Sequence, residues 1–257
     1  MGMSFDSAIW GVDSYAPAYR PGPTCLYDQV AKIKKPAFWG RYIRCPNLSD
    51  GNVLGTAEVN YLFEKGCAIL PIYNRTVYQR KGIAWAGTFA DGAMDAMDAI
   101  AAATSLGIPP GVWIYADIEP GWPNVMTDWI LGWWCVMCPS LYWPGLYCTL
   151  RDKYCNALTQ VQSLQPPPNM DFIDLIRWRT IPDIHQISYV WSFSPHRGSF
   201  TQPPAWEPLS PPCHPDGVRV WQYCGNHLVG SVYVDADIAT SDGFYGMWQP
   251  PAPLWQS

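Results

Sequence analysis

Short apolar runs, separated by segments with helical periodicity, recur along this chain at intervals of about thirty residues. The runs that we predict to be strands are Ala8–Asp13, Ala37–Ile43, Ala68–Tyr73, Gly111–Asp117, Tyr142–Cys148, Gln186–Trp191, Val218–Tyr223 and Ser231–Asp235. Eight strands joined by helical crossovers favour a closed parallel barrel with its helices outside. The pattern therefore predicts an α/β protein with one (β/α)8 TIM-like barrel.

The segments between the runs carry helical signals. Ala84–Leu106 is rich in Ala and Met at helical spacing, and it is followed by Gly107, a common C-cap, and by Pro109–Pro110, which stops a helix. We predict two further helices at Glu58–Lys65 and Met126–Met137.

The second half of the chain is less regular. Gln162–His185 contains three consecutive prolines, and its part Phe172–Arg179 is compatible with either strand or helix. Ser194–Pro215 is rich in proline and is predicted to be a long loop over the barrel mouth. We expect the barrel domain to span residues 1–246 and a proline-rich tail to span 247–257.

Composition narrows the function. The chain has 257 residues, of which 49% are hydrophobic and 14% charged, so it can bury a large core. A net charge of -5 without a basic cluster argues against nucleic-acid binding. We expect no membrane span, because no apolar stretch approaches the roughly 20 residues that a span needs. The first residues do not resemble a signal peptide.

Two other features of the composition leave alternatives open. The 15 Trp and 15 Tyr suit a sugar-binding cleft, although core packing accounts for many of them equally well. The nine cysteines have irregular spacing and an odd count, which favours reduced thiols over a disulfide framework. Cys135 and Cys138 form a CxxC motif, but no second ligand pair lies at zinc spacing.

The strongest chemical signal is Val112–Pro120, an apolar run that ends in two acids. Alternate strand residues point to opposite faces, so Trp113, Tyr115, Asp117 and Glu119 should share one face. Catalytic side chains of barrel enzymes lie at the C-terminal ends of the strands, and a pair of carboxylates can cleave a glycosidic bond. Solvated acids at a strand end are the alternative interpretation.

Two other predicted strands carry acids at corresponding places. Asp13 ends the first strand, and Asp235 shares a face of the last strand with Asp237 and Tyr233. We therefore expect Asp13, Asp117, Glu119 and Asp235 to lie in one cleft. Such clustering raises the pKa of at least one acid through repulsion and partial desolvation.

The chain resembles the glycoside-hydrolase-like barrels of bacteria and phages, which are related to the lysozyme-type muramidases of glycoside hydrolase family 25. The resemblance covers about residues 8–245, and the motifs that carry it are Gly11–Tyr15, Trp39–Tyr42, Ile69–Asn74, Tyr115–Glu119, Gly145–Tyr147, Val220–Tyr223 and Val234–Asp237.

The resemblance implies a glycosidase of the lysozyme or muramidase type. It implies catalytic acids at Asp13, Asp117, Glu119 and Asp235. In this interpretation Glu119 is the general acid, Asp117 stabilises positive charge or orients an acetamido group, and Asp13 and Asp235 shape the field. The groove residues that we expect to bind substrate are Tyr42, Tyr73, Asn74, Tyr147, Trp191, Gln222, Tyr223 and Asp237.

Three classes of function stay open, because many barrels of this kind lack a demonstrated activity. The chain is a hydrolase of peptidoglycan or another polymer of N-acetylated sugars, a catalytically weak glycan-binding barrel, or a structural part of a phage particle such as a tail component. The expected partners are a cell-wall glycan and, in the last case, other phage structural proteins. We expect no cofactor and no metal centre, and a place outside the cell or on a virion.

Overall fold

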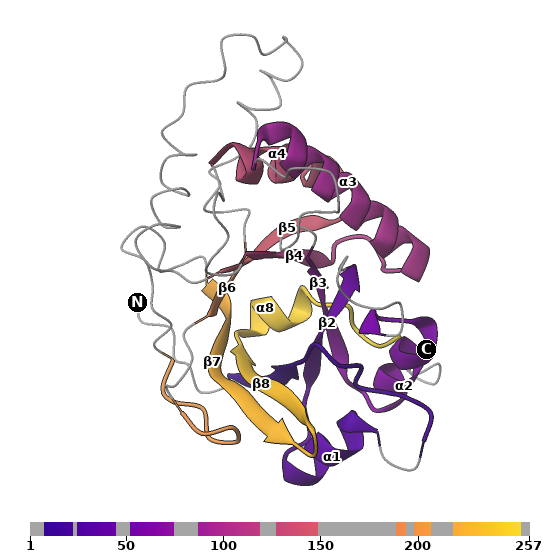
Figure 1. Cartoon of the computed structure of the whole chain (residues 1–257), viewed down its shortest axis with the longest axis vertical. Helices are drawn as coiled ribbons and strands as arrows, with labels where there is room; N and C mark the ends of the chain where they lie inside the picture. The colour runs from indigo at the N-terminus through magenta and orange to yellow at the C-terminus, as the bar shows by residue number, and fades with distance from the viewer. Residues whose placement is uncertain are drawn as a thin grey trace.

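A computed structural model of the chain describes residues 8–22, 25–44, 52–74, 87–118, 127–148, 189–193, 198–206 and 218–252. Eight strands form one closed barrel in the order in which they occur along the chain (Figure 1). Their bounds are β1 Ile9–Asp13, β2 Phe38–Arg44, β3 Ala68–Tyr73, β4 Trp113–Ile118, β5 Trp143–Cys148, β6 Tyr189–Phe193, β7 Val218–Val229 and β8 Val232–Ala239. The predicted TIM-like barrel is confirmed.

The direction of the last strand differs from our prediction of an all-parallel barrel. Strands β1 to β7 pair in parallel, whereas β8 pairs antiparallel with both β7 and β1. The physical reason is the two-residue turn Gly230–Ser231, because so short a connection can only join antiparallel neighbours. Gly230 has a φ of 63°, which suits glycine in such a turn. As a result, β8 starts at the end of the barrel where the parallel strands finish.

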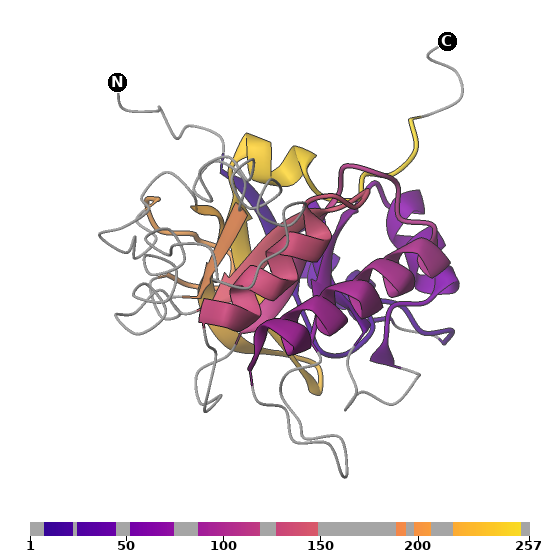
Figure 2. The ribbon, with the colours of Figure 1, turned by 90° about the horizontal axis from the view of Figure 1, so that it is seen from above.

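Helices cover the barrel as predicted where the structure describes them. Their bounds are α1 Leu26–Ile33, α2 Thr56–Glu64, α3 Phe89–Leu106, α4 Thr127–Met137 and α8 Ser241–Tyr245. The pair α3 and α4 lies side by side along one flank (Figures 1 and 2). A capping box at Thr88 and Asp91 begins α3, and Gly107 in the left-handed conformation ends it. None of the helices in these ranges is long and apolar enough to cross a membrane.

Alternate strand residues divide the core into two layers. Side chains that point inward fill the barrel with aromatic and aliphatic groups, among them Phe38, Ile72, Tyr115 and Trp191. The opposite faces pack against the helices and form the larger outer core. On β4 the division is as predicted, with Trp113 and Tyr115 inside and Ile114 and Ala116 outside.

Gly40 leaves room for the side chains of Asp13 and Trp191 inside the barrel. A Cβ at Gly40 would lie 2.6 Å from Cβ of Asp13 and 3.3 Å from Cη2 of Trp191. Because β2 presents only a hydrogen atom there, both side chains can occupy the barrel axis.

The short helix α8 closes the N-terminal end of the barrel. It follows β8 and lies at the opposite end from the tip of the β7–β8 hairpin (Figure 2). Phe244 packs near Phe38, and Met247 is buried among the interior side chains. Trp248 is also buried and forms a β-bridge with Ile69. Met247 and Trp248, the first residues of the predicted tail, thus pack against the barrel.

Candidate active site

The acids predicted at strand ends converge on the C-terminal end of the parallel strands. Asp13 ends β1, Asp117 lies near the end of β4, and Asp235 lies near the start of β8. Asp13 and Asp235 are direct neighbours across the β1–β8 pair. Glu119, the predicted general acid, lies outside the described residues, so its place in the cluster stays a prediction.

Asp117 is held by two neutral donors from adjacent strands. The Tyr42 hydroxyl donates to Asp117 Oδ2 over 2.9 Å, and Asn74 Nδ2 donates to the same oxygen over 2.6 Å. Asp117 is 1% exposed and Asn74 is 5% exposed. Donors that contact a carboxylate stabilise its charged form. Tyr42, Asn74 and Asp117 thus come together as predicted.

A second group of polar side chains surrounds Asp13. Gln222 Nε2 donates to Asp13 Oδ2 over 2.9 Å and to Asp235 Oδ2 over 2.8 Å, while its Oε1 accepts from the Tyr147 hydroxyl over 2.7 Å. Trp191 Nε1 donates to Asp237 Oδ1 over 3.0 Å. This second group thus comes from five strands, β1 and β5 to β8, whereas Asp117 and its partners come from β4, from β2 and from the position directly after β3.

Asp13 and Asp237 form a buried carboxyl pair. Burial raises the pKa of each well above its usual range, and the Asp235 charge raises both further. Because Asp237 raises the pKa of Asp13 whereas the hydrogen bond from Asp13 lowers that of Asp237, a protonated Asp13 that donates to Asp237 is the favoured form of the pair. The pKa of Asp235 is also raised, first by burial. In the part of the chain that the structure describes, none of these three acids forms an ion pair with a Lys, Arg or His side chain.

Two aromatic residues that we expected to line a groove are part of the interior core. Trp191 is 1% exposed, and its ring centroid lies 4.4 Å from that of Tyr147. The Trp191 ring nitrogen donates to Asp237, and the Tyr147 hydroxyl donates to Gln222. The narrow barrel therefore buries both rings in its interior rather than along an open groove.

Tyr73 and Tyr223 point away from the site. The Tyr73 hydroxyl donates to Asp95 and Asp98 of α3, outside the barrel. The Tyr223 hydroxyl donates to the Phe200 carbonyl and accepts from Trp10. Each tyrosine directly adjoins an inward-pointing residue on its strand, so strand alternation turns it outward. Both predicted groove positions are corrected to the outer core.

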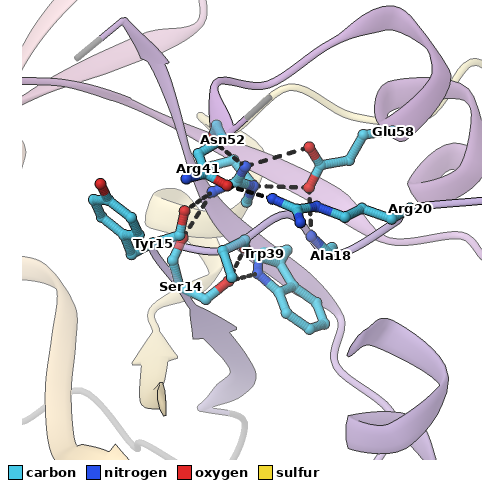
Figure 3. Close-up of polar contacts among 9 residues, drawn as sticks. Ser14, Tyr15, Ala18, Arg20, Trp39, Arg41, Asn52 and Glu58 are labelled. Atoms are coloured by element: carbon cyan, nitrogen blue, oxygen red, sulfur yellow. Dashed lines mark hydrogen bonds and ion pairs between the residues drawn. The ribbon is translucent and has the colours of Figure 1, made fainter. Parts of the chain in front are cut away.

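One buried ion pair next to the site was missed from the sequence. Arg41 on β2 is fully buried, and its Nε lies 2.7 Å from Glu58 Oε1 (Figure 3). Arg41 also donates to the backbone carbonyls of Ser14 and Tyr15, which directly follow Asp13. This pair therefore fixes the segment that holds Asp13 in place. The sequence does carry a signal for this pair, because Arg41 is a charged residue within a strand that is otherwise largely buried.

Four of the cysteines in the described ranges form no disulfide. Cys25, Cys67, Cys138 and Cys224 are free thiols. Burial raises the pKa of Cys138 in the CxxC motif to about 11, which makes it a poor nucleophile at neutral pH. No group of three or more His, Cys, Asp or Glu in the described part of the chain has the geometry to hold a metal ion.

Comparison with known protein families identifies the family of this chain. Residues 33–239 match the model of the Rv2525c-like, glycoside hydrolase-like domain. The chain belongs to this family. The match spans β2 to β8 and thus includes all the site residues above except Asp13. No curated protein sequence matches the chain.

Solved structures share the fold of this glycoside hydrolase-like domain. A Bacillus stearothermophilus protein, described as uncharacterized, is 28% identical, with a TM-score of 0.73, and the match covers 93% of this chain and 100% of that one. The Mycobacterium tuberculosis Tat-secreted protein Rv2525c, in complex with L-tartrate, is 16% identical, with a TM-score of 0.57 and coverage of 94% and 100%. The modular autolysin LytC of Streptococcus pneumoniae, in complex with a synthetic peptidoglycan ligand, is 14% identical, with a TM-score of 0.53 and coverage of 93% and 48%.

Proposed function

We propose that this chain hydrolyses glycosidic bonds in peptidoglycan or a related polymer of N-acetylated sugars. The observation that carries the proposal is the carboxyl cluster of the buried Asp13 and Asp237 with the partly buried Asp235, which forms no ion pair with a cation among the described residues. Burying acids in this way lowers stability, and such arrangements recur where catalysis needs acids with raised pKa values. The family membership and the carboxylate chemistry of glycosidases support the same class of reaction.

The described geometry suits Asp117 for a role as a fixed negative charge. Two donors hold Asp117 Oδ2, and little water reaches the carboxylate. In such a site a carboxylate stabilises the positive charge that develops on the sugar ring, or it orients the N–H of an acetamido group. Asn74 Oδ1 is buried and has no hydrogen-bond partner in the described part, so it offers an acceptor to a bound sugar.

The proton donor in this proposal is Glu119, two residues beyond Asp117. Asp13 and Asp235 contribute to the electrostatic field around the bound sugar rather than attacking it. Because peptidoglycan is an extracellular polymer, the protein would act at a cell wall, either as a secreted protein or as part of a phage particle. Rv2525c is itself described as Tat-secreted, which supports an extracellular place.

The experiment is hydrolysis of purified cell walls, followed by reducing-sugar release and mass spectrometry of the fragments. Glu119→Gln keeps the side-chain shape and removes the titratable proton, so turnover should fall by about 10²–10⁴-fold while glycan affinity barely changes. Glu64→Gln, at an exposed position on α2, is the matched control and should retain full activity. Glycan binding without cleavage by the unmodified protein would instead establish a binding barrel.

A further inference from the structure

The nitrogen and the oxygen of the Gln222 side-chain amide are both hydrogen-bonded to protein side chains. Both acids that it contacts accept from Nε2, at 2.9 Å for Asp13 and 2.8 Å for Asp235, and its Oε1 accepts from Tyr147 at 2.7 Å. We propose that Gln222 is a positioning residue that clamps Asp13 and Asp235 together, rather than the substrate-binding residue that the sequence suggested. An amide has two N–H donors, so none is left for a sugar hydroxyl.

Tyr147 determines which way the amide points. A glutamine amide can turn by half a rotation and exchange its oxygen with its nitrogen. The Tyr147 hydroxyl donates to the carbonyl end of Gln222 and so keeps the nitrogen end on the two acids. The Tyr147 ring is itself held against Trp191 in the barrel interior. The clamp is therefore rigid, as preorganised sites require.

The two clamped acids need such a partner because of the strand register. Asp13 and Asp235 are directly opposite each other in the antiparallel β1–β8 pair. Like charges at opposed strand positions repel and destabilise the pair. Gln222 extends from β7, on the far side of β8, and places one N–H against each carboxylate. The amide thereby offsets the repulsion without adding a charge.

Other groups around the clamp act in both directions, since Asp237 raises the pKa of Asp13 whereas the Asn226 N–H lowers that of Asp235. Asp237 interacts with Asp13 from β8, and its Oδ1 accepts from Trp191. The Asn226 backbone N–H donates to Asp235 from the β7 extension, and Cys224 lies within electrostatic range of Asp235 and Asp237. Burial and neighbouring acids raise the pKa of Asp13, whereas the Gln222 bonds lower the pKa of Asp13 and Asp235. Loss of the amide should therefore raise both pKa values further.

A titration of the carboxyl carbons tests the clamp without requiring activity. In protein labelled with 13C-aspartate, Asp13→Asn and Asp235→Asn assign the two signals. Gln222→Met keeps the length of the side chain and removes the amide, so both titration midpoints should rise by about 1 pH unit or more. Trp221→Phe perturbs the neighbouring residue on the opposite face of β7 and should leave both midpoints in place.

A second variant tests the clamp in case Gln222→Met does not fold. Tyr147→Phe removes only the hydroxyl that orients the amide, so it should move the same two midpoints upward by a smaller amount. Midpoints that stay unchanged in Gln222→Met, or in Tyr147→Phe if the first variant does not fold, would overturn the clamp.

The catalytic consequence of the clamp rests on the proposed function. On a hydrolysed glycan, Gln222→Met should lower kcat by about 10²-fold through misplaced acids and leave KM nearly unchanged. A raised KM with an unchanged kcat would show that Gln222 binds substrate and would overturn the positioning role. If the unmodified protein cleaves no glycan, the proposed function fails, and the carboxyl titration still decides whether the clamp exists.

Discussion

Replacing Asp237 by asparagine should flatten the dependence of stability on pH. In the folded protein Asp13 and Asp237 have pKa values raised well above the usual range, mainly by burial. The folded state therefore binds more protons than the unfolded state above about pH 4, so stability falls as pH rises toward the folded pKa values. An asparagine can accept from Trp191 and donate to Asp13, so it supplies the bridging hydrogen without a proton from solvent.

The magnitude follows from the number of protons. While the folded state holds one extra proton, each pH unit lowers the free energy of unfolding by about 1.4 kcal/mol. For a chain of this length this corresponds to about 2–4 °C in Tm per kcal/mol. Asp237→Asn should reduce this slope by up to about 1.4 kcal/mol per pH unit, the contribution of one proton. The variant should therefore be more stable than the unmodified protein at pH 8.

Urea unfolding followed by tryptophan fluorescence at pH 5, 6, 7 and 8 measures this slope. Asp242→Asn, at an exposed position in α8, serves as the control and should keep the slope of the unmodified protein. Equal slopes in Asp237→Asn and the unmodified protein would refute the shared proton, as would a stability that rises from pH 6 to pH 8.

Three further substitutions test the packing around the site by chemical unfolding. Glu58→Gln leaves the buried Arg41 charge without its partner and should cost about 3–5 kcal/mol; a loss below about 1 kcal/mol would contradict a tightly held pair. Gly40→Ala forces a methyl group against Asp13 and should cost about 1–3 kcal/mol, together with a loss of hydrolysis, whereas normal activity would show that the interior can expand. Tyr73→Phe removes hydroxyl bonds outside the barrel, so it should lower stability by about 1 kcal/mol and leave hydrolysis unchanged; a reduced kcat would place Tyr73 in the site after all.

The barrel and the inward face of β4 could be predicted because they depend on local periodicity. Asp117 shares the interior side with Tyr115, as alternation required. The same rule should have excluded Tyr73 and Tyr223, because Asn74 and Gln222 next to them point inward, and adjacent strand residues cannot share a face.

Other features needed the tertiary structure. The direction of β8 depends on how far β7 extends, and only an extension to Val229 reduces the connection to the Gly230–Ser231 turn. The apolar pattern places Trp191 in a strand but cannot show whether its ring faces a groove or a filled barrel. The interior is filled because Gly11, Gly40 and Gly145 leave room for the rings of Phe38, Trp191 and Tyr115.

The rate of glycosidic cleavage by Asp117→Asn tests the central claim most directly. An amide keeps the shape of Asp117 but removes the negative charge that Tyr42 and Asn74 hold in place. Reducing-end release from purified peptidoglycan and binding of the same glycan should be measured for both proteins. We predict that cleavage falls by about 10²–10⁴-fold with affinity nearly unchanged. An unaltered cleavage rate in Asp117→Asn would contradict a carboxylate mechanism at this end of the barrel.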